Sequence, residues 1–162
     1  MIPIPNWCDC ELTIKGDKAE LRRFKEFAYA ISPGNTEFEP LDFNQFVPQP
    51  PEVVASVTDE HAQRPLWYEW RVKNWGTKWG PRIEDDYIIR DRIENSGRLM
   101  YKFDTAWSPP TPVVLAMSRM FSTLEFELEY WEGSVGFHGV FKASNGQVRV
   151  NQVHDYSGPR GG

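Results

Sequence analysis

The densest group of residues that could bind a ligand lies between residues 67 and 82, where aromatic and cationic side chains are interleaved. Proteins that bind single-stranded nucleic acid use this combination, with rings for the bases and cations for the phosphates. Trp, Tyr and Arg also anchor most protein interfaces. The candidate binding residues of this segment and of one later motif are Trp67, Trp70, Arg71, Lys73, Trp75, Lys78, Trp79, Arg82 and Trp107.

A purely structural role for this segment is the interpretation we favour for most of its rings. Trp side chains are usually well buried, so they could cover one face or one end of a sheet while Lys and Arg extend outward. The net charge of -5 points the same way, because an acidic protein repels phosphate backbones on average. Nucleic acid is therefore an alternative partner and not the expected one.

Residues 104–110 (Asp-Thr-Ala-Trp-Ser-Pro-Pro) form a predicted junction between a strand and a helix. A helix N-terminus can bind an anion or a carboxylate, which would place a ligand pocket beneath Trp107. We favour a plain turn that starts the helix, in which Ser108 caps the helix and Asp104 bonds to nearby backbone. No glycine-rich phosphate loop accompanies the motif.

Few side chains are suited to catalysis. His61, His138 and His154 are isolated from one another in sequence and match no metal-ligand spacing. Cys8 could act as a nucleophile only beside a histidine, and its place on an apolar strand face favours a core position. We therefore expect no catalytic residue, no metal and no cofactor, with an enzyme of unrecognised site as an alternative.

The composition describes a globular protein with a heavy aromatic load of seven Trp, ten Phe and six Tyr in 162 residues. The acidic runs at residues 84–91 and 125–129 are interpreted as solvated faces. No segment approaches the ~20 apolar residues of a membrane span, and residues 1–5 lack the features of a signal peptide. We expect a cytoplasmic protein that has no membrane partner.

Alternating apolar and polar residues predict two clear strands, at residues 8–15 and 124–131. Cys8 and Cys10 fall on the buried face of the first strand, as reduced thiols. Further strands are expected at 83–89, 98–107, 135–143 and 147–153, with turns at 94–97 and 145–146. Helices are expected from Asp17 to about 32–34, at 51–62, at 65–75 and from Ser108 to about 122–123.

Placed in order, these elements form a split βαβ pattern, which is the ferredoxin-like α+β fold. An aromatic and Pro-rich insertion of about residues 35–80 follows the first helix, and an extra β-hairpin follows the last strand of the pattern. We expect one domain over residues 1–156 and a flexible tail at 157–162, because the tail residues are too small and polar to pack.

Four motifs carry a family resemblance: Asn-Trp-Cys at 6–8, Phe-Val-Pro-Gln-Pro at 46–50, the run from Trp70 to Trp79, and residues 103–110. Together they resemble the YubB-like family of phage, prophage and plasmid proteins over about residues 6–139. The resemblance implies a ferredoxin-like fold and an origin in a bacterial mobile element. It implies no activity and no catalytic residue, because the family has no established activity.

The aromatic excess and the scarcity of catalytic groups favour a binding module. We expect it to contact a host or phage macromolecule through the exposed part of residues 67–82, with a protein as the preferred partner. Single-stranded nucleic acid is the alternative partner of the same segment.

Overall fold

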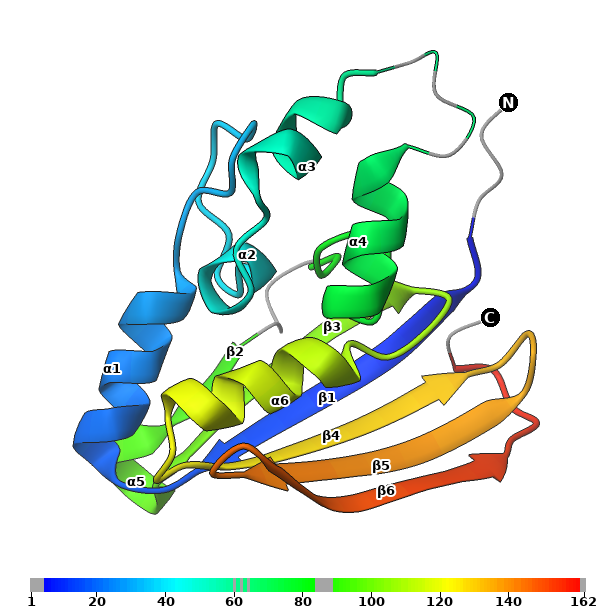
Figure 1. Cartoon of the computed structure of the whole chain (residues 1–162). Coiled ribbons are helices and arrows are strands. Elements are labelled where there is room, and N and C mark those ends of the chain that lie inside the picture. The colour runs from blue at the N-terminus through cyan, green and yellow to red at the C-terminus, as the bar shows by residue number, and fades with distance from the viewer. Residues whose placement is uncertain (1–4, 60, 62, 64, 84–88, 161–162) are drawn as a thin grey trace.

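The computed structural model describes residues 5–59, 61, 63, 65–83 and 89–160, and in these residues a six-stranded antiparallel sheet forms the centre of the fold (Figure 1). Its spatial order is β2-β3-β1-β4-β5-β6. The strands are β1 (Trp7–Lys15), β2 (Ile89–Arg92), β3 (Arg98–Ala106), β4 (Glu125–Glu132), β5 (Phe137–Ser144) and β6 (Gln147–Asp155). The helices are α1 (Lys18–Ala28), α2 (Phe43–Phe46), α3 (Pro51–Ser56), α4 (Leu66–Asn74), α5 (Ile93–Ser96) and α6 (Thr111–Met120). The first four strands with α1 and α6 have the split βαβ order, and the predicted fold class is confirmed.

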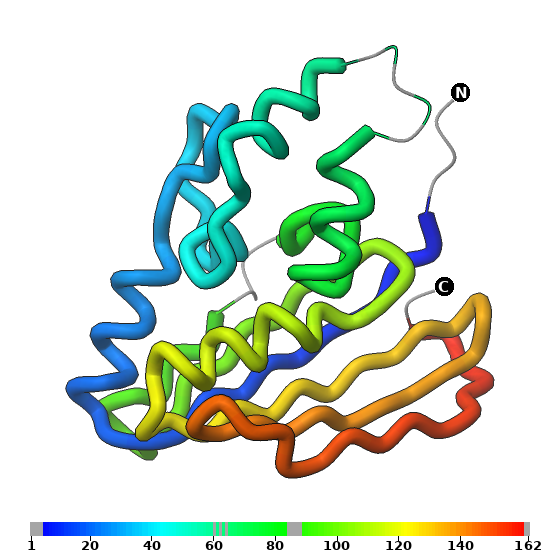
Figure 2. The backbone as a smooth tube through the Cα atoms, viewed as in Figure 1, coloured from blue at the N-terminus to red at the C-terminus, as the bar shows by residue number. Residues whose placement is uncertain are grey.

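The two faces of the sheet differ because its strands alternate. The even-numbered residues of β1 from Cys8 to Ile14 are fully buried, as predicted. α1, α6 and the insertion pack on this face (Figures 1 and 2). The odd-numbered residues from Trp7 to Lys15 lie on the opposite face, which we call the open face because no helix of the described residues covers it.

α1 starts as predicted and ends early. The carboxylate of Asp17 accepts a hydrogen bond from the backbone N–H of Glu20 at 3.1 Å and so caps the helix. The helix stops at Ala28 instead of residues 32–34, since the chain then becomes extended and pairs Ala30 with Glu39 in an antiparallel bridge. Ile31, which lies beyond the end of the helix, is 44% exposed.

The insertion between α1 and β2 contributes to the same core as the sheet. Leu41, Phe43, Phe46 and Trp75 are buried with the strand residues. The ring of Phe46 stacks on that of Phe24 of α1, with centroids 5.2 Å apart. The aromatic load of this segment therefore holds the insertion against the ferredoxin-like part of the chain.

The helices of the insertion match the prediction in place but not always in length. α4 confirms the helix predicted at 65–75, and Gly76 follows it with φ 89° while its N–H donates to the carbonyl of Arg71. The helix predicted at 51–62 is shorter, because α3 ends at Ser56, whose hydroxyl donates to the carbonyl of Val53. None of the helices in the described part of the chain is long and apolar enough to cross a bilayer.

The predicted hairpins form with shifted boundaries. β2 begins at Ile89, where the strand predicted at 83–89 ends, and residues 84–88, with their acidic run, lie outside the described residues. β2 is an edge strand with three exposed residues, so no alternation marks it. α5 replaces the turn expected at 94–97, and Gly97 ends it with φ 63°. Asn145 and Gly146, at φ 49° and 71°, form the predicted turn between β5 and β6.

The C-terminal residues return to the open face. Arg160 donates to the carboxylates of Asp9 at 3.1 Å and Glu11 at 3.0 Å. Its guanidinium carbon lies 3.6 Å from the ring centroid of Trp131. The segment that was expected to be a flexible tail thus makes contacts with β1 and β4, which its polar composition does not predict.

Candidate binding site

The inward face of α4 carries Trp67 together with Trp70 and Arg71, which follow it by three and four residues. The ring of Trp70 packs edge-on to that of Trp75, with centroids 5.8 Å apart. Trp75 is only 3% exposed, and its indole N–H donates to the carbonyl of Val47 at 3.0 Å. Trp75 therefore belongs to the core and cannot contact a partner, and Trp70 packs against that core.

Arg71 is held inside the insertion by several contacts. Its Nε donates to the side-chain carbonyl of Gln49 at 2.8 Å, and its Nη1 donates to the backbone carbonyl of Lys78 at 3.3 Å. Its guanidinium lies 4.8 Å from the Trp67 ring and 5.2 Å from the Trp75 ring. Burial lowers the pKa of this guanidinium, although an arginine stays charged. Arg71 thus ties α4 to the loop that follows it.

Rings and cations also follow one another across the surface from α4 to the start of β1. Lys78 Nζ lies 6.0 Å from the ring centroid of Tyr68 and 4.3 Å from that of Trp79. The Trp79 ring lies 6.0 Å from the Trp7 ring, and the Arg82 guanidinium lies 3.9 Å from Trp7 on the other side. We call these five residues the ring–cation row: Tyr68, Lys78, Trp79, Trp7 and Arg82. The row joins the insertion to the edge of the open face.

One end of the ring–cation row is fixed to the sheet. Arg82 and Asp104 exchange two backbone hydrogen bonds, at 2.8 and 2.9 Å, and their side chains form an ion pair at 2.8 Å. Asp104 was expected to bond to nearby backbone, and the structure shows that its carboxylate accepts from the Arg82 guanidinium. The reason is that the loop after α4 returns beside β3 and supplies a charged partner.

The outward face of α4 exposes apolar side chains. Leu66, Tyr68 and Val72 are 49%, 41% and 44% exposed, and Tyr68 and Val72 lie one helical turn apart. Lys73, another of the predicted binding residues, is exposed on the same helix. Apolar residues bordered by charged ones have the composition of a protein interface.

Trp107 follows β3 in a backbone conformation that is rare for a large side chain, with φ 70°. Its N–H donates to the carbonyl of Asn6 at 2.8 Å, and its side chain is 44% exposed. The hydrogen bond to Asn6 fixes the chain next to the start of β1, which holds Trp107 in this conformation.

The start of α6 differs from the prediction. Ser108 does not cap the helix, because its hydroxyl donates to the carbonyl of Gly76, and Pro110 occupies the N-cap position instead. The hydroxyl of Thr77 likewise donates to the carbonyl of Ala106 at 3.0 Å. The loop after α4 is thus fastened to the β3–α6 junction, a contact that no local pattern predicts.

A polar pocket of about 130 Å³ lies next to Arg71. Glu39 and Asp42 line it, and burial raises the pKa of both carboxyls. Asp42 accepts hydrogen bonds from the Ser32 hydroxyl and from the backbone N–H of Asn44, where it caps α2. These bonds give Asp42 a structural role, and sequence reasoning missed it because the residues that surround it come from separate segments.

The cysteines do not converge with the histidines, of which His138 and His154 are paired across β5 and β6. Cys8 and Cys10 are free thiols buried on the helix-covered face, where burial raises the pKa of the Cys10 thiol. His138 lies on the open face, stacked on Trp131 at 5.0 Å and with its Nε2 3.9 Å from the Glu129 carboxylate. The sheet therefore separates the thiols from this imidazole. Across the described residues, no group of three or more side chains is placed to hold a metal.

The ferredoxin-like domain of Api92-like proteins matches residues 74–158, just over half of the chain. The chain belongs to the Api92-like family. The crystal structure of a protein api92 from Yersinia pseudotuberculosis has a similar fold, with a TM-score of 0.68 over 96% of this chain and 100% of that one. The two sequences are 11% identical, so this likeness concerns the fold alone. No match was found among curated proteins.

The match to the Api92-like family begins at Asn74, the last residue of α4. It therefore includes Lys78, Trp79 and Arg82 of the ring–cation row but not the two rings that complete it. Those rings, Tyr68 and Trp7, are also the members that were absent from the predicted set of binding residues. Trp7 stands in the motif at residues 6–8, and only the position of the loop after α4 brings Trp79 to it.

Proposed function

We propose that this protein is a non-catalytic binding module whose partner is a protein of the host cell or of a phage. The observation that supports this best is the outward face of α4, where Leu66, Tyr68 and Val72 expose apolar surface on a helix that has no fully buried residue. Lys73 and Lys78 border this surface, so a matching partner carries apolar residues together with carboxylates.

The contacts of the inward face favour a protein over nucleic acid as the partner. A nucleic-acid site needs ring faces for bases and unengaged cations for phosphates. Trp70 and Trp75 pack in or against the core, and Arg71 is bonded inside the insertion. The side chains that α4 leaves exposed are mainly apolar, which suits a protein surface.

The test compares two double variants that remove similar exposed side chains. Tyr68→Ala/Val72→Ala changes the outward face of α4, and Tyr29→Ala/Val153→Ala is the matched control, since Tyr29 and Val153 are 54% and 59% exposed elsewhere. We expect a protein that is retained from nuclease-treated bacterial lysate by the wild type and the control to be lost from the first variant. The purified partner must then bind the wild type and the control more tightly than it binds Tyr68→Ala/Val72→Ala.

Equal retention by all three forms, with urea unfolding showing each of them folded, would place the interface elsewhere. Loss of every partner on nuclease treatment would instead favour nucleic acid.

Single-stranded nucleic acid is a second candidate partner, which the alternation in the ring–cation row supports. Trp7 and Trp79 lie beside Arg82 and Lys78, so a bound strand would quench their fluorescence. Quenching by an oligonucleotide that weakens steeply with salt, and that is reduced in Lys78→Gln but not in the exposed control Lys18→Gln, would support this candidate. Fluorescence that an oligonucleotide leaves unchanged would rule it out.

We also propose that the protein originates from a phage or plasmid and acts in the cytoplasm of a bacterium. The support is the resemblance of the four sequence motifs to the YubB-like family, because these motifs include the residues that fasten the loop after α4 to the β3–α6 junction. Fractionation of cells that produce the untagged chain tests the location. Recovery in a membrane or periplasmic fraction would contradict it.

A further inference from the structure

Four cationic side chains gather at one end of the open face, away from the ring–cation row. They come from three neighbouring strands: Arg90 and Arg92 from β2, Arg98 from β3 and Lys15 from β1. With Thr13, Ser96, Met100 and Glu127 they line a hollow of about 480 Å³. This volume is within the usual range of small-molecule sites.

The register of the sheet places these cations directly opposite one another. Arg92 is paired with Arg98 across β2 and β3, and Arg98 is paired with Lys15 across β3 and β1. Like charges in directly opposite positions destabilise a sheet. An anion bound to this row would offset the repulsion.

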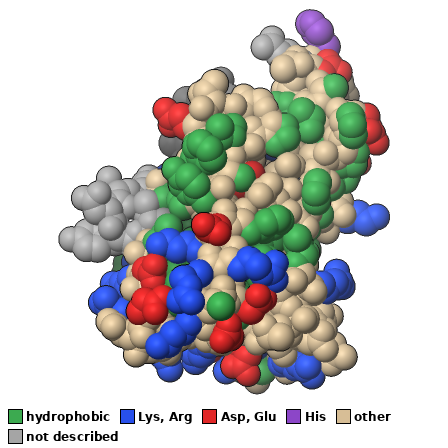
Figure 3. Space-filling model, turned by 90° about the vertical axis from the view of Figure 1, so that its left-hand side faces the viewer, with side chains coloured by type: hydrophobic (Ala, Val, Ile, Leu, Met, Phe, Trp, Pro, Cys, Tyr) green, Lys and Arg blue, Asp and Glu red, His purple; other side chains and the backbone are tan. Residues whose placement is uncertain are grey.

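The carboxylates of the described residues do not offset this charge, because none of them lies within ion-pair distance of the four cations. Glu125 stands opposite Lys15 in the register and is also outside that distance. Neighbouring carboxylates are engaged by other cations, as in the pairs of Asp91 with Lys25 and of Glu94 with Arg22. Figure 3 shows charged side chains of both signs gathered around α1 and the β2 edge, below the more apolar insertion.

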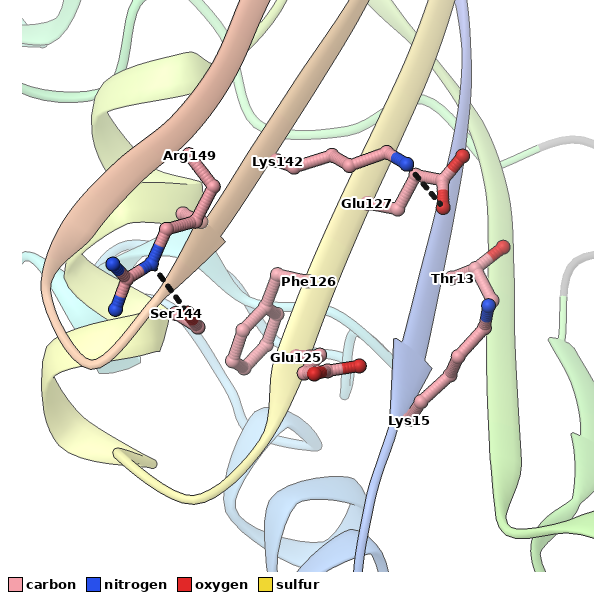
Figure 4. Close-up of a pocket in the computed structure, with 9 residues that line it drawn as sticks. Thr13, Lys15, Glu125, Phe126, Glu127, Lys142, Ser144 and Arg149 are labelled. Carbon is pink, nitrogen blue, oxygen red and sulfur yellow. Dashed lines mark hydrogen bonds and ion pairs between the residues drawn. The ribbon is translucent and has the colours of Figure 1, made fainter.

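An adjoining hollow of about 280 Å³ shares Thr13, Lys15 and Glu127 and continues over β4, β5 and β6. There the Glu127 carboxylate is directed at Lys142, at 3.8 Å, as the close-up shows (Figure 4). Arg149 donates to the hydroxyl of Ser144 at 2.9 Å. Among the described residues that line the hollow over β2, β3 and β1, the four cations outnumber the single carboxylate, that of Glu127.

We propose that the hollow over β2, β3 and β1 binds a compact oligophosphate, as carried by a nucleoside triphosphate or by the 5′-triphosphate end of a nucleic acid. Four cations around one hollow match a ligand with several negative charges in a small volume. Three of them are arginines, whose planar forks bind phosphate through paired hydrogen bonds. Beyond the hollow, the open face carries the carboxylates of Asp9, Glu11 and Glu129, of which the first two are bonded to Arg160, so the four cations form a compact group at one end of the sheet.

The test is calorimetric titration of the whole protein with inorganic tripolyphosphate at low salt. Losing one charged hydrogen-bond donor is expected to weaken binding by about tenfold or more in Arg92→Gln and in Arg98→Gln. The control is Arg119→Gln, which removes the same charge from an exposed position on α6, across the sheet, and is expected to bind as the wild type does. Urea unfolding of each variant shows whether it is folded, and the two hollow variants serve as independent tests.

Failure of the wild type to bind tripolyphosphate, or equal weakening in Arg119→Gln, would overturn the proposal. The affinities of a nucleoside triphosphate and a 5′-triphosphate oligonucleotide are then compared with each other. Whichever of the two binds more tightly supports the proposal and identifies the source of the phosphates. An oligonucleotide with a 5′-hydroxyl, or a polyglutamate peptide, that bound as tightly as tripolyphosphate would show that the site does not recognise a compact oligophosphate.

Discussion

Arg98 of β3 lies directly opposite Lys15 of β1 and directly opposite Arg92 of β2. This arrangement places three cations in one row across the sheet, and their repulsion opposes folding when no anion is bound. We therefore expect Arg98→Gln to raise the free energy of unfolding by about 0.2–1 kcal/mol at low salt. Urea unfolding at low and at high salt measures this gain, which should shrink as salt screens the charges.

Arg119→Gln serves as the control for this stability measurement too, because Arg119 is exposed on α6, on the other face of the sheet from the row of cations. A lower stability of Arg98→Gln than of the wild type at low salt would show that the three cations do not repel one another appreciably.

Arg71 is expected to be a stabilising residue. Replacing it with Met leaves the carbonyls of Gln49 and Lys78 without their donor and should lower the free energy of unfolding by about 1–3 kcal/mol. Arg71→Lys should also destabilise the protein, since one ammonium cannot reproduce the planar fork. Lys73→Met, on the outward face of α4, is the control, and denaturant unfolding that gave equal losses for both positions would refute this role.

The backbone at Trp107 should prefer glycine to alanine. Its φ of 70° is unfavourable for any residue that has a Cβ, so Trp107→Gly should be about 1 kcal/mol more stable than Trp107→Ala. The same pair of substitutions at Trp67, inside α4, should show the reverse order by about 1 kcal/mol, because alanine favours a helix. Thermal and urea unfolding of the four variants check both signs, and an alanine preference at Trp107 would show that its backbone is unstrained.

The pKa of Asp42 should make part of the stability depend on pH. Burial raises this pKa in the folded protein, so the folded state binds more protons than the unfolded state above pH ~4. The stability from the protonated form is fully present below the unfolded pKa and is lost as the pH rises through the folded pKa. Asp42→Asn removes this titration, so its free energy of unfolding should rise relative to the wild type as the pH increases from ~4 through the raised pKa of Asp42.

Asp91 provides a control of opposite sign for the pH experiment. A hydrogen bond from Lys25 lowers the pKa of Asp91, so the stability it contributes is present above its unfolded pKa and is lost as the pH falls through the folded value. Asp91→Asn should therefore lose stability relative to the wild type as the pH rises. If the stabilities of Asp42→Asn and Asp91→Asn, each relative to the wild type, changed in the same direction with pH, the two pKa shifts would not be of opposite sign.

Local patterns were sufficient to predict much of the fold. The alternation in β1 and β4, the cap at Asp17 and the turn at Asn145 depend on neighbouring residues, and the structure confirms them. The early end of α1 and the true start of α6 depend on contacts with the insertion, which is distant in sequence. Sequence therefore gives no local sign of either boundary.

The candidate sites were harder to predict for the same reason. Trp7 and Trp79 meet only after the sheet has formed and the loop after α4 has been fastened beside it. Arg98 and Lys15 are far apart in the chain and become neighbours through strand pairing. An aromatic and basic stretch of sequence shows that a surface of this type can exist, but the strand register decides which cations share a hollow.

β6 is the last strand of the sheet in the described residues, and almost every one of its nine residues is exposed. Its outer backbone N–H and C=O groups form a template on which a strand from a second molecule can be added, and the exposed Val148 and Val153 make that edge attractive to apolar strands. A concentrated solution of this protein thus has a built-in route to aggregation by sheet extension, and a lysine in place of Val153 would act as a gatekeeper against it.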